Sequence, residues 1–240
     1  MKTLAVDIGN TRTKAAVFEQ NEIIQHYDPA GETVESWMEE VVGKYDIHRA
    51  IVSSTSDATG LTGIIQRLNV VYLDHTTPLP VSLVYDTPET LGRDRIAGVV
   101  GAHHILPGKN VLVVDAGTCI TYDLVTADGV FIGGNISPGL DMRLRSMHEF
   151  TARLPLVRRT SETGELGRST SAALQFGAEN GVILEIEGYI SRLDMEHGNL
   201  SVILTGGDSA HFAKKLKTEI FVRPNLVLIG LNEILRYNVA

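Results

Sequence analysis

Two short stretches of the sequence combine residue types that bind phosphate groups and cations. Each begins with an aspartate at the end of an apolar run and continues through glycine to threonine: Asp7-Ile8-Gly9-Asn10-Thr11 and Asp115-Ala116-Gly117-Thr118. In such a turn, backbone N–H groups and the threonine hydroxyl can bind an anion, while the aspartate can hold a cation directly or through water. One Asp-Gly pair is usually only a strand-ending turn, but two copies at equivalent places favour a polyphosphate bound between them.

Asp94 is a further candidate for chemistry, because it stands between Arg93 and Arg95. Guanidinium groups on both sides favour the ionised carboxylate, which is the form that accepts a proton. Taken by itself, a carboxylate flanked by arginines is more often part of an ion-pair cluster on the surface. Thr87 and Pro88 are helix-start signals, so we expect a helix that begins there and carries Asp94.

The elements that must position these residues alternate between strands and helices, which predicts an α/β fold. In the first half of the chain we expect strands at Lys2 to Ile8, Thr13 to Glu19, Ile23 to Tyr27, Arg49 to Ser53 and Val70 to Leu73, and helices at Glu32 to Lys44 and Leu61 to Leu68. Asp7 therefore lies near the end of the first strand.

The same pattern begins again after Pro107-Gly108. The second half has strands at Val111 to Asp115, Thr121 to Val125 and Val130 to Ile136, and Asp115 ends the first of them. An internal repeat of this length predicts two related domains, 1–109 and 110–240, that face each other across a cleft.

Composition excludes several classes of protein. The 240 residues carry a formal net charge of −8 and no long basic run, which argues against a nucleic-acid-binding surface. Cys119 is the only cysteine, so a disulfide framework and a cysteine-rich zinc site are excluded. No apolar run reaches the roughly 20 residues that cross a bilayer, and the N-terminus does not resemble a signal peptide. We expect a cytoplasmic globular protein that does not bind a membrane.

Other well-known active-site motifs are missing. The sequence has neither the Walker A pattern nor the Gly-x-Gly-x-x-Gly of Rossmann domains. His148 and Glu149 start like a zincin motif that then lacks its second histidine, and there is no Gly-x-Ser-x-Gly elbow. Metalloprotease and serine hydrolase activities are therefore excluded.

Four motifs, which follow one another along nearly the whole chain, resemble those of the type III pantothenate kinases. They are Asp7 to Lys14, Tyr85 followed by Gly92-Arg93-Asp94-Arg95, Asp115 to Thr118, and Gly133 to Gly139. The paired Asp-x-Gly turns alone would indicate only the wider superfamily of acetate and sugar kinases, heat-shock ATPases and actin. The resemblance implies duplicated ribonuclease H-like domains, each a mixed sheet flanked by helices, with a nucleotide cleft between them.

The resemblance also implies an activity, which is the ATP-dependent phosphorylation of pantothenate to 4'-phosphopantothenate, the first step of coenzyme A biosynthesis. It implies a homodimer with the substrate site near the subunit interface. We expect Asp7 to bind Mg²⁺, directly or through water. The residues expected to bind ATP are Asp7, Ile8, Gly9, Asn10, Thr11, Arg12, Thr13, Lys14 and, from the second domain, Thr118.

In the family, the aspartate that matches Asp94 is the general base that accepts the proton of the pantothenate hydroxyl. The positions that match substrate contacts are Tyr85, Gly92, Arg93, Asp94, Arg95 and Thr170. Thr170 also lies where a helix begins, so a simple capping role is its alternative. Asp115 resembles the position that binds a monovalent cation, K⁺ or NH4⁺. The residues alone indicate only an oxygen ligand there and do not distinguish K⁺ from Mg²⁺.

Two segments of the second half carry further signals. Leu154 to Ser169 reads as a long loop that could act as a lid, with Arg153, Arg158 and Arg159 expected in solvent. A helix from Ser169 to about Asp194 carries Gly177 and Gly181 on one face, which suggests self-association, with packing on the chain's own sheet as the alternative.

After a strand at Leu200 to Leu204, the stretch Thr205-Gly206-Gly207-Asp208 forms a turn of the kind that cradles adenosine in the superfamily. Asp208 is also a plain N-cap candidate for the helix that follows. A last helix is expected at Asn225 to Tyr237.

Three functions remain open on the sequence. The chain can be a working pantothenate kinase, a nucleotide-binding accessory or regulatory protein with the same fold, or a kinase of another small alcohol. Asp94 favours an enzyme, because a binding protein has no need of a base at the acceptor hydroxyl.

Overall fold

The computed structural model describes residues 1–9, 12–29, 34–54 and 68–239. The chain folds into two compact units. The first unit consists of Met1–Gly108, Val125–Ile132 and Asn225–Ala240, and the second of Lys109–Leu124 and Gly133–Pro224.

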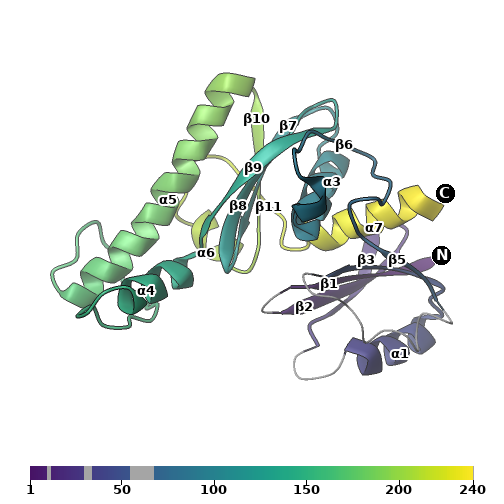
Figure 1. Cartoon of the computed structure of the whole chain (residues 1–240), viewed down its shortest axis with the longest axis horizontal. Coiled ribbons are helices and arrows are strands. Elements are labelled where there is room, and N and C mark those ends of the chain that lie inside the picture. The colour runs from purple at the N-terminus through teal and green to yellow at the C-terminus, as the bar shows by residue number, and fades with distance from the viewer. Residues whose placement is uncertain (10–11, 30–33, 55–67, 240) are drawn as a thin grey trace. The chain divides into compact units, whose positions relative to one another are not determined.

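The first unit contains a five-stranded mixed sheet with the order β3-β2-β1-β4-β5 (Figure 1). Its strands are β1 (Lys2–Ile8), β2 (Thr13–Glu19), β3 (Glu22–Tyr27), β4 (Arg49–Ser54) and β5 (Asn69–Tyr72). β1 is antiparallel to β2 and parallel to β4, and this register places Asp7 opposite Lys14 on one side and Ser53 on the other. The strands predicted for this half are confirmed to within one residue at each end.

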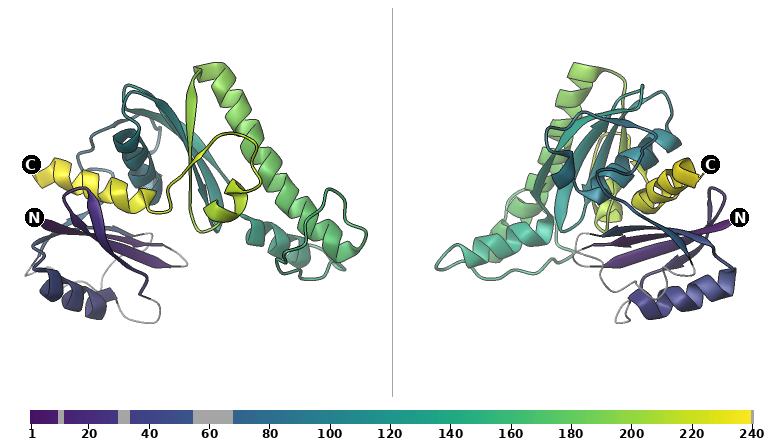
Figure 2. Two further views of the ribbon diagram at one scale, coloured as in Figure 1. Left: turned by 180° about the vertical axis from the view of Figure 1, so that it is seen from behind. Right: turned by 45° about the vertical axis from the view of Figure 1, so that its right-hand side comes forward.

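Helices cover both faces of this sheet. On one face, α1 (Val34–Tyr45) buries Trp37, Met38 and Val41 against alternate strand residues such as Leu4 and Val6. On the other face, α7 (Leu226–Val239) lies across β1, β2 and β4 (Figures 1 and 2). The helical spacing of apolar residues and the alternation along the strands produce this layered core directly.

A close helix crossing fixes the position of α3 (Arg93–Ile105) in the first unit. α3 packs against α7 through glycines on both helices. A Cβ atom at Gly101 would lie 2.6 Å from the Leu226 carbonyl oxygen, and one at Gly230 would lie 1.8 Å from that of Ala97. Only glycine permits this approach, so the centre of α3 is held tightly against α7.

The second sheet has the order β11-β10-β7-β8-β9-β6. Its strands are β6 (Ser82–Leu83), β7 (Asn110–Ala116), β8 (Cys119–Val125), β9 (Val130–Pro138), β10 (Leu200–Thr205) and β11 (Phe221–Val222). The order β9-β8-β7-β10-β11 repeats β3-β2-β1-β4-β5, strand for strand. This duplication confirms the predicted fold class of two mixed sheets flanked by helices.

The helices of the second unit are α4 (Leu140–Glu149), α5 (Thr170–His197) and α6 (Ser209–Ala213). α5 buries Val182, Ile186 and Ile190 in a cluster with residues of β7, β8 and β10 (Figure 2). Every third or fourth residue of this long helix therefore faces the sheet, and the opposite side of the helix remains exposed.

The helix predicted to begin at Thr87 and run through Asp94 is not continuous. Thr87 and Pro88 start only a short 3-10 helix, Pro88–Thr90, and the chain is extended at Leu91 before α3 begins at Arg93, so the prediction is wrong. The short helix begins at the predicted place, although the Thr87 side chain makes no capping hydrogen bond, and the non-helical backbone of Gly92 (φ −55°, ψ 129°) separates it from α3. The helix predicted at Leu61 to Leu68 lies outside the described residues up to residue 67.

Each of the two compact units combines stretches that are separate in the sequence. α7 belongs to the first unit, because it packs on β1 and α3, and so does Val125–Ile132. The division into two domains at residues 109 and 110 stays a prediction. Among the described helices, none combines the length and the apolar character that a membrane span requires.

Candidate active site

Three strand and helix ends of the first unit meet around Asp7. Asp7 lies one residue before the end of β1, and its neighbours in register are Lys14 on β2 and Ser53 on β4. The turn after β1 is closed by a hydrogen bond from the Gly9 N–H to the Arg12 carbonyl, at 3.1 Å. Asn10 and Thr11, which were predicted to contact ATP, lie outside the described residues. Ile8 and Thr13 are the facing ends of the two strands.

The carboxyl group of Asp7 is in an unusual electrostatic environment. Burial raises its pKa to about 6, and the negative charge of Asp94 contributes to that rise. A hydrogen bond from Ser53 and the charge of Lys14 act in the opposite direction and only partly compensate. Two carboxylates that repel each other at a half-buried position form a site at which a cation would be stabilised.

The first turn of α3 holds the second of these carboxylates. The Asp94 Oδ1 atom accepts a hydrogen bond from the backbone N–H of Arg95, at 2.9 Å. A Cβ atom at Gly92 would lie 2.6 Å from the same oxygen, so the carboxylate occupies space that any other residue at position 92 would fill. Asp94 is half-buried, which leaves a face of its carboxylate accessible to another molecule.

Arg93 links α3 to the end of β4. Its guanidinium donates a hydrogen bond to the carbonyl oxygen of Ser54, at 2.5 Å. Ser54 follows Ser53, which hydrogen-bonds Asp7. The carboxyl ends of β1 and β4 and the start of α3 therefore form one connected site. That the two arginines keep Asp94 ionised stays a prediction.

Arg95 belongs to a different cluster in the same unit. It is only 6% exposed, and its guanidinium lies over the rings of Tyr85 and Phe131, 5.8 and 5.9 Å from their centroids. The two rings stack on each other at 6.0 Å, and Arg95 donates a long hydrogen bond of 3.4 Å to the Tyr85 hydroxyl. Tyr85 and Arg95, which are ten positions apart, are brought together as the motif predicted, whereas Phe131 had not been predicted.

In the second unit, two other turns pack directly on the turn from Asp115 to Thr118. A Cβ atom at Gly139 would lie 2.1 Å from the Gly117 carbonyl oxygen, and one at Gly206 would lie 2.4 Å from the Asp115 carboxylate. Gly206 also has a φ of +90°, which favours glycine. Asp115 is half-buried, while Thr118 is exposed.

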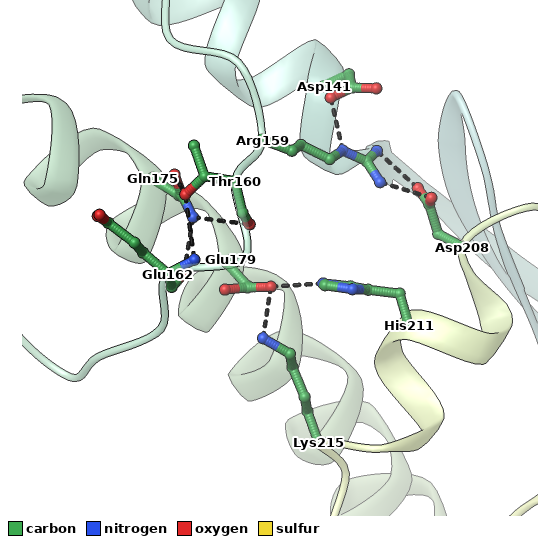
Figure 3. A network of polar contacts seen from close by, with 9 residues as sticks. All are labelled: Asp141, Arg159, Thr160, Glu162, Gln175, Glu179, Asp208, His211 and Lys215. Atoms are coloured by element: carbon green, nitrogen blue, oxygen red, sulfur yellow. Dashed lines mark hydrogen bonds and ion pairs between the residues drawn. The ribbon is translucent and has the colours of Figure 1, made fainter.

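The structure corrects the expected role of the Asp208 side chain. Asp208 occupies the N-cap position of α6 but makes no capping hydrogen bond with its side chain. Its two carboxylate oxygens instead accept hydrogen bonds from Arg159, at 2.6 and 2.8 Å (Figure 3). Arg159 also donates to Asp141 in the first turn of α4, at 2.6 Å. The expectation that Arg159 lies in solvent is therefore wrong, whereas Arg153 and Arg158 are not part of this network.

The segment 154–169 contains neither helix nor strand, as predicted. Side chains from α5 nevertheless hold it in place. Gln175 accepts from the Thr160 hydroxyl at 3.0 Å and donates to the Glu162 carbonyl at 2.8 Å, and Asn180 donates to the Gly164 carbonyl at 2.9 Å. At the start of α5, Ser169 is the residue that caps, because its Oγ accepts from the Ala172 N–H. Thr170 is left exposed in the first turn and is not the N-cap.

A partly buried polar cluster beside β8 was not predicted. Glu185 of α5 accepts hydrogen bonds from Tyr122, at 2.8 Å, and from Ser137 and Arg143. Burial alone would raise the pKa of Glu185, but these hydrogen bonds together lower it. Ser137 belongs to the Gly133 to Gly139 motif, so the cluster fixes this motif to α5. No local pattern could reveal it, since its members are far apart in the sequence.

The described residues include no group of three or more His, Cys, Asp or Glu side chains arranged to hold a metal ion.

Comparison with known proteins identifies relatives along the full chain. A family model described as type III pantothenate kinase matches residues 3–192. Type III pantothenate kinases of Bacteroides fragilis and Phocaeicola vulgatus are 46% and 42% identical, and each match covers 98% of both chains. Among solved structures, the ROK hexokinase of Thermus thermophilus has a TM-score of 0.51 and 14% identity over the whole of both chains, a likeness of fold alone.

Proposed function

We propose that this chain, which belongs to the type III pantothenate kinase family, transfers the terminal phosphoryl group of ATP to pantothenate and forms 4'-phosphopantothenate. The match to pantothenate kinases over nearly the full length supports the activity. The observation that carries the mechanism is that the carboxyl group of Asp94, in the first turn of α3, lies close enough to that of Asp7, near the end of β1, to raise its pKa. The reaction is the first step of coenzyme A biosynthesis and implies a cytoplasmic enzyme, because its phosphoryl donor is ATP.

Asp94 is the general base. Its carboxylate accepts the proton of the pantothenate hydroxyl as that oxygen attacks the phosphorus, and the leaving oxygen departs with ADP. A base in phosphoryl transfer must lie within hydrogen-bond reach of the acceptor hydroxyl, which attacks in line with the leaving oxygen, rather than be especially strong. The backbone hydrogen bond from Arg95 to Asp94 and the restriction at Gly92 support a fixed carboxylate position.

Asp7 and the turn after it form the phosphate site of the first unit. Asp7 holds Mg²⁺, which neutralises phosphate charge when bound. The Lys14 ammonium and the backbone N–H groups of the turn bind the β- and γ-phosphates, with Arg12 exposed at its edge. Asn10 and Thr11 belong to this site by their place in the motif.

The Arg95 cluster is the substrate pocket. The Arg95 side chain is almost fully buried, and its guanidinium lies over both aromatic rings, which restricts its orientation. Its positive charge is the group that would bind a carboxylate or amide oxygen of pantothenate. Tyr85 and the backbone from Gly92 to Arg95 complete the pocket. The family resemblance adds Thr170, in the first turn of α5, as a further substrate contact.

In the second unit, Thr118 binds the nucleotide phosphates, and Asp115 holds a monovalent cation, K⁺ or NH4⁺. Thr118 is exposed next to a turn that is tightly packed on both sides, which suits a contact with a ligand. The half-buried Asp115 carboxylate at a strand end is an oxygen ligand of the kind such cations use.

The enzyme is a homodimer formed through α5. Ala173, Gly177, Leu184, Gly188 and Met195 are exposed along one side of this helix. Their separations of four and seven residues make a continuous stripe. Within the described residues, a Cβ atom at Gly177 or Gly188 would meet nothing within 4 Å, so these glycines do not serve packing in their own subunit. A second backbone could approach there closely.

The proposed function is tested by ADP release from ATP and Mg²⁺, with and without pantothenate, in K⁺ or NH4⁺ buffer and again in Na⁺ buffer. Release that depends on pantothenate and on K⁺ or NH4⁺ supports both the activity and the cation site. Nucleotide binding without turnover would favour an accessory protein of this fold, whereas turnover with a different acceptor would identify a kinase of another small alcohol.

A further inference from the structure

Arg159 connects two turns that both pack on the Asp115 to Thr118 turn. The first is the turn at Gly139, whose N–H donates to the Thr118 carbonyl at 3.0 Å. The second is the turn from Gly206 to Asp208, in which the Asp208 N–H donates to the Ala116 carbonyl at 2.9 Å. The two turns therefore lie against neighbouring residues of one loop.

The Arg159 side chain binds the outer end of each of these turns. It forms two parallel hydrogen bonds to the Asp208 carboxylate and a third, through Nε, to Asp141, which lies two residues after Gly139. Figure 3 shows the guanidinium between the two carboxylates. The side chains of Arg159 and Asp208 are 29% and 18% exposed, so water screens this pair less than an ordinary surface pair.

A second set of charged residues holds the helix that follows Asp208. Glu179 of α5 accepts hydrogen bonds from His211 in α6 and from Lys215, the latter at 2.7 Å (Figure 3). Burial alone would raise the pKa of Glu179, but the bonds from Lys215 and His211 lower it. The helix after the Gly206-Gly207 turn is anchored in this way, and Arg159 binds the turn itself through Asp208.

We propose that Arg159 is a positioning residue for nucleotide binding. By bonding to Asp208 and Asp141, Arg159 holds the Gly206 to Asp208 turn and the Gly139 turn against the Asp115 to Thr118 turn, which binds phosphate in the proposed function. The inference rests on the proposed role of Thr118 in nucleotide binding. Arg159 itself does not touch the phosphates in this arrangement, because its guanidinium is directed to Asp208 and Asp141. Arg159 would increase the affinity for nucleotide because the Asp115 to Thr118 turn is already ordered before binding and loses less conformational entropy.

The arrangement also gives the segment 154–169 a defined task. Arg159 is the residue through which this segment contacts both turns. Just after it, Thr160 and Glu162 are held by hydrogen bonds to the Gln175 side chain. The segment then works as a brace for the nucleotide turn.

The test compares Arg159→Met and Arg159→Lys with Arg158→Met, a matched control at the neighbouring arginine. The affinity for a non-hydrolysable ATP analogue is measured by calorimetry without pantothenate, together with the KM values of both substrates and the melting temperature. We expect Arg159→Met to weaken analogue binding on the order of tenfold and to raise the KM for ATP similarly, with the KM for pantothenate unchanged. Lysine should restore part of the affinity, because it keeps the charge without the fork geometry.

Two results would overturn the proposal. One is analogue affinity in Arg159→Met equal to that of Arg158→Met. The other is a loss of melting temperature accompanied by equal changes in both KM values, which would show a role in stability alone. Asp208→Asn serves as a second variant if Arg159→Met does not fold. Because the binding measurement needs no acceptor, it also gives an answer if the protein proves inactive on pantothenate, and the two failures remain distinct.

Discussion

The carboxyl groups of Asp7, at the end of β1, and Asp94, in the first turn of α3, lie close enough for the charge of one to raise the pKa of the other. The two residues are 87 positions apart in the sequence, and the pairing of β1 with β4 and the contact of Arg93 with Ser54 bring them together. Their proximity suits the roles proposed for them, in which Asp7 would hold the metal ion and Asp94 would accept the proton of the acceptor hydroxyl.

The repulsion at Asp7 predicts that this residue destabilises the ligand-free protein. Because its folded pKa of about 6 exceeds the unfolded value of 3.8, its contribution to stability is present below pH 3.8 and is lost as the pH rises through 6. At neutral pH, Asp7→Asn should therefore raise the melting temperature by a few degrees and weaken the response to Mg²⁺ without abolishing it. The melting temperatures of the wild type and the variant are compared at pH 7.5 and again at pH 4.5. If the variant does not melt at a higher temperature than the wild type at pH 7.5, Asp7 and Asp94 do not repel each other as proposed.

The same pKa predicts how Mg²⁺ binding depends on pH. Asp7 must lose its proton before it can hold the cation, so the Mg²⁺ concentration needed for half-maximal activity should rise as the pH falls from 7.5 to 5.5. The titration is carried out at saturating ATP, with Asp7→Asn as the control for protonation of ATP itself. If this Mg²⁺ concentration depends on pH in the same way in both proteins, Asp7 does not hold the metal ion.

Gly92→Ala should damage catalysis more than stability. The added Cβ would lie 2.6 Å from the Asp94 Oδ1 atom, and the carboxylate can relieve this contact only by rotating away. A misplaced base lowers kcat by roughly 10–100-fold, whereas the fold loses little because a side-chain end can move. Gly43→Ala in α1 is the control, because a Cβ atom there would meet nothing within 4 Å and should stabilise the helix by up to about 1 kcal/mol.

The exposed stripe of α5 predicts a variant that dissociates the proposed dimer. Leu184 is 67% exposed, and a charged side chain there would be buried without a partner if two helices met at this stripe. Leu184→Arg should shift the sedimentation of the protein to that of a monomer at micromolar concentration. Phe150→Arg, at an 84% exposed position just after α4, should not. A wild-type protein that already sediments as a monomer would remove the dimer from the account.

Local patterns predicted the parts of the site that depend on neighbours in the sequence. An acid before a Gly-containing turn at the end of an apolar run was enough to locate Asp7 and Asp115, because strand ends and turns are set by a few adjacent residues. The duplication followed from the same local signals, and the matching strand orders of the two sheets confirm it.

Interactions between distant residues could not be predicted in this way. Arg159 and Asp208 are separated by 49 positions, and nothing in the segment around Arg159 distinguishes it from the neighbouring Arg158. Phe131, which stacks on Tyr85, lies on β9, far from Tyr85 in the sequence. Each of these features is determined by tertiary packing rather than by propensity.

The most direct test of the mechanism is a comparison of Asp94→Asn with the wild-type protein in two measurements, kcat for ADP release with pantothenate and affinity for a non-hydrolysable ATP analogue. If Asp94 is the general base, Asp94→Asn should lower kcat by a factor on the order of 10²–10⁴, while the analogue binds almost as tightly as to the wild type. A variant that keeps its turnover, or that loses nucleotide affinity as strongly as activity, would contradict the assignment of Asp94 as the base.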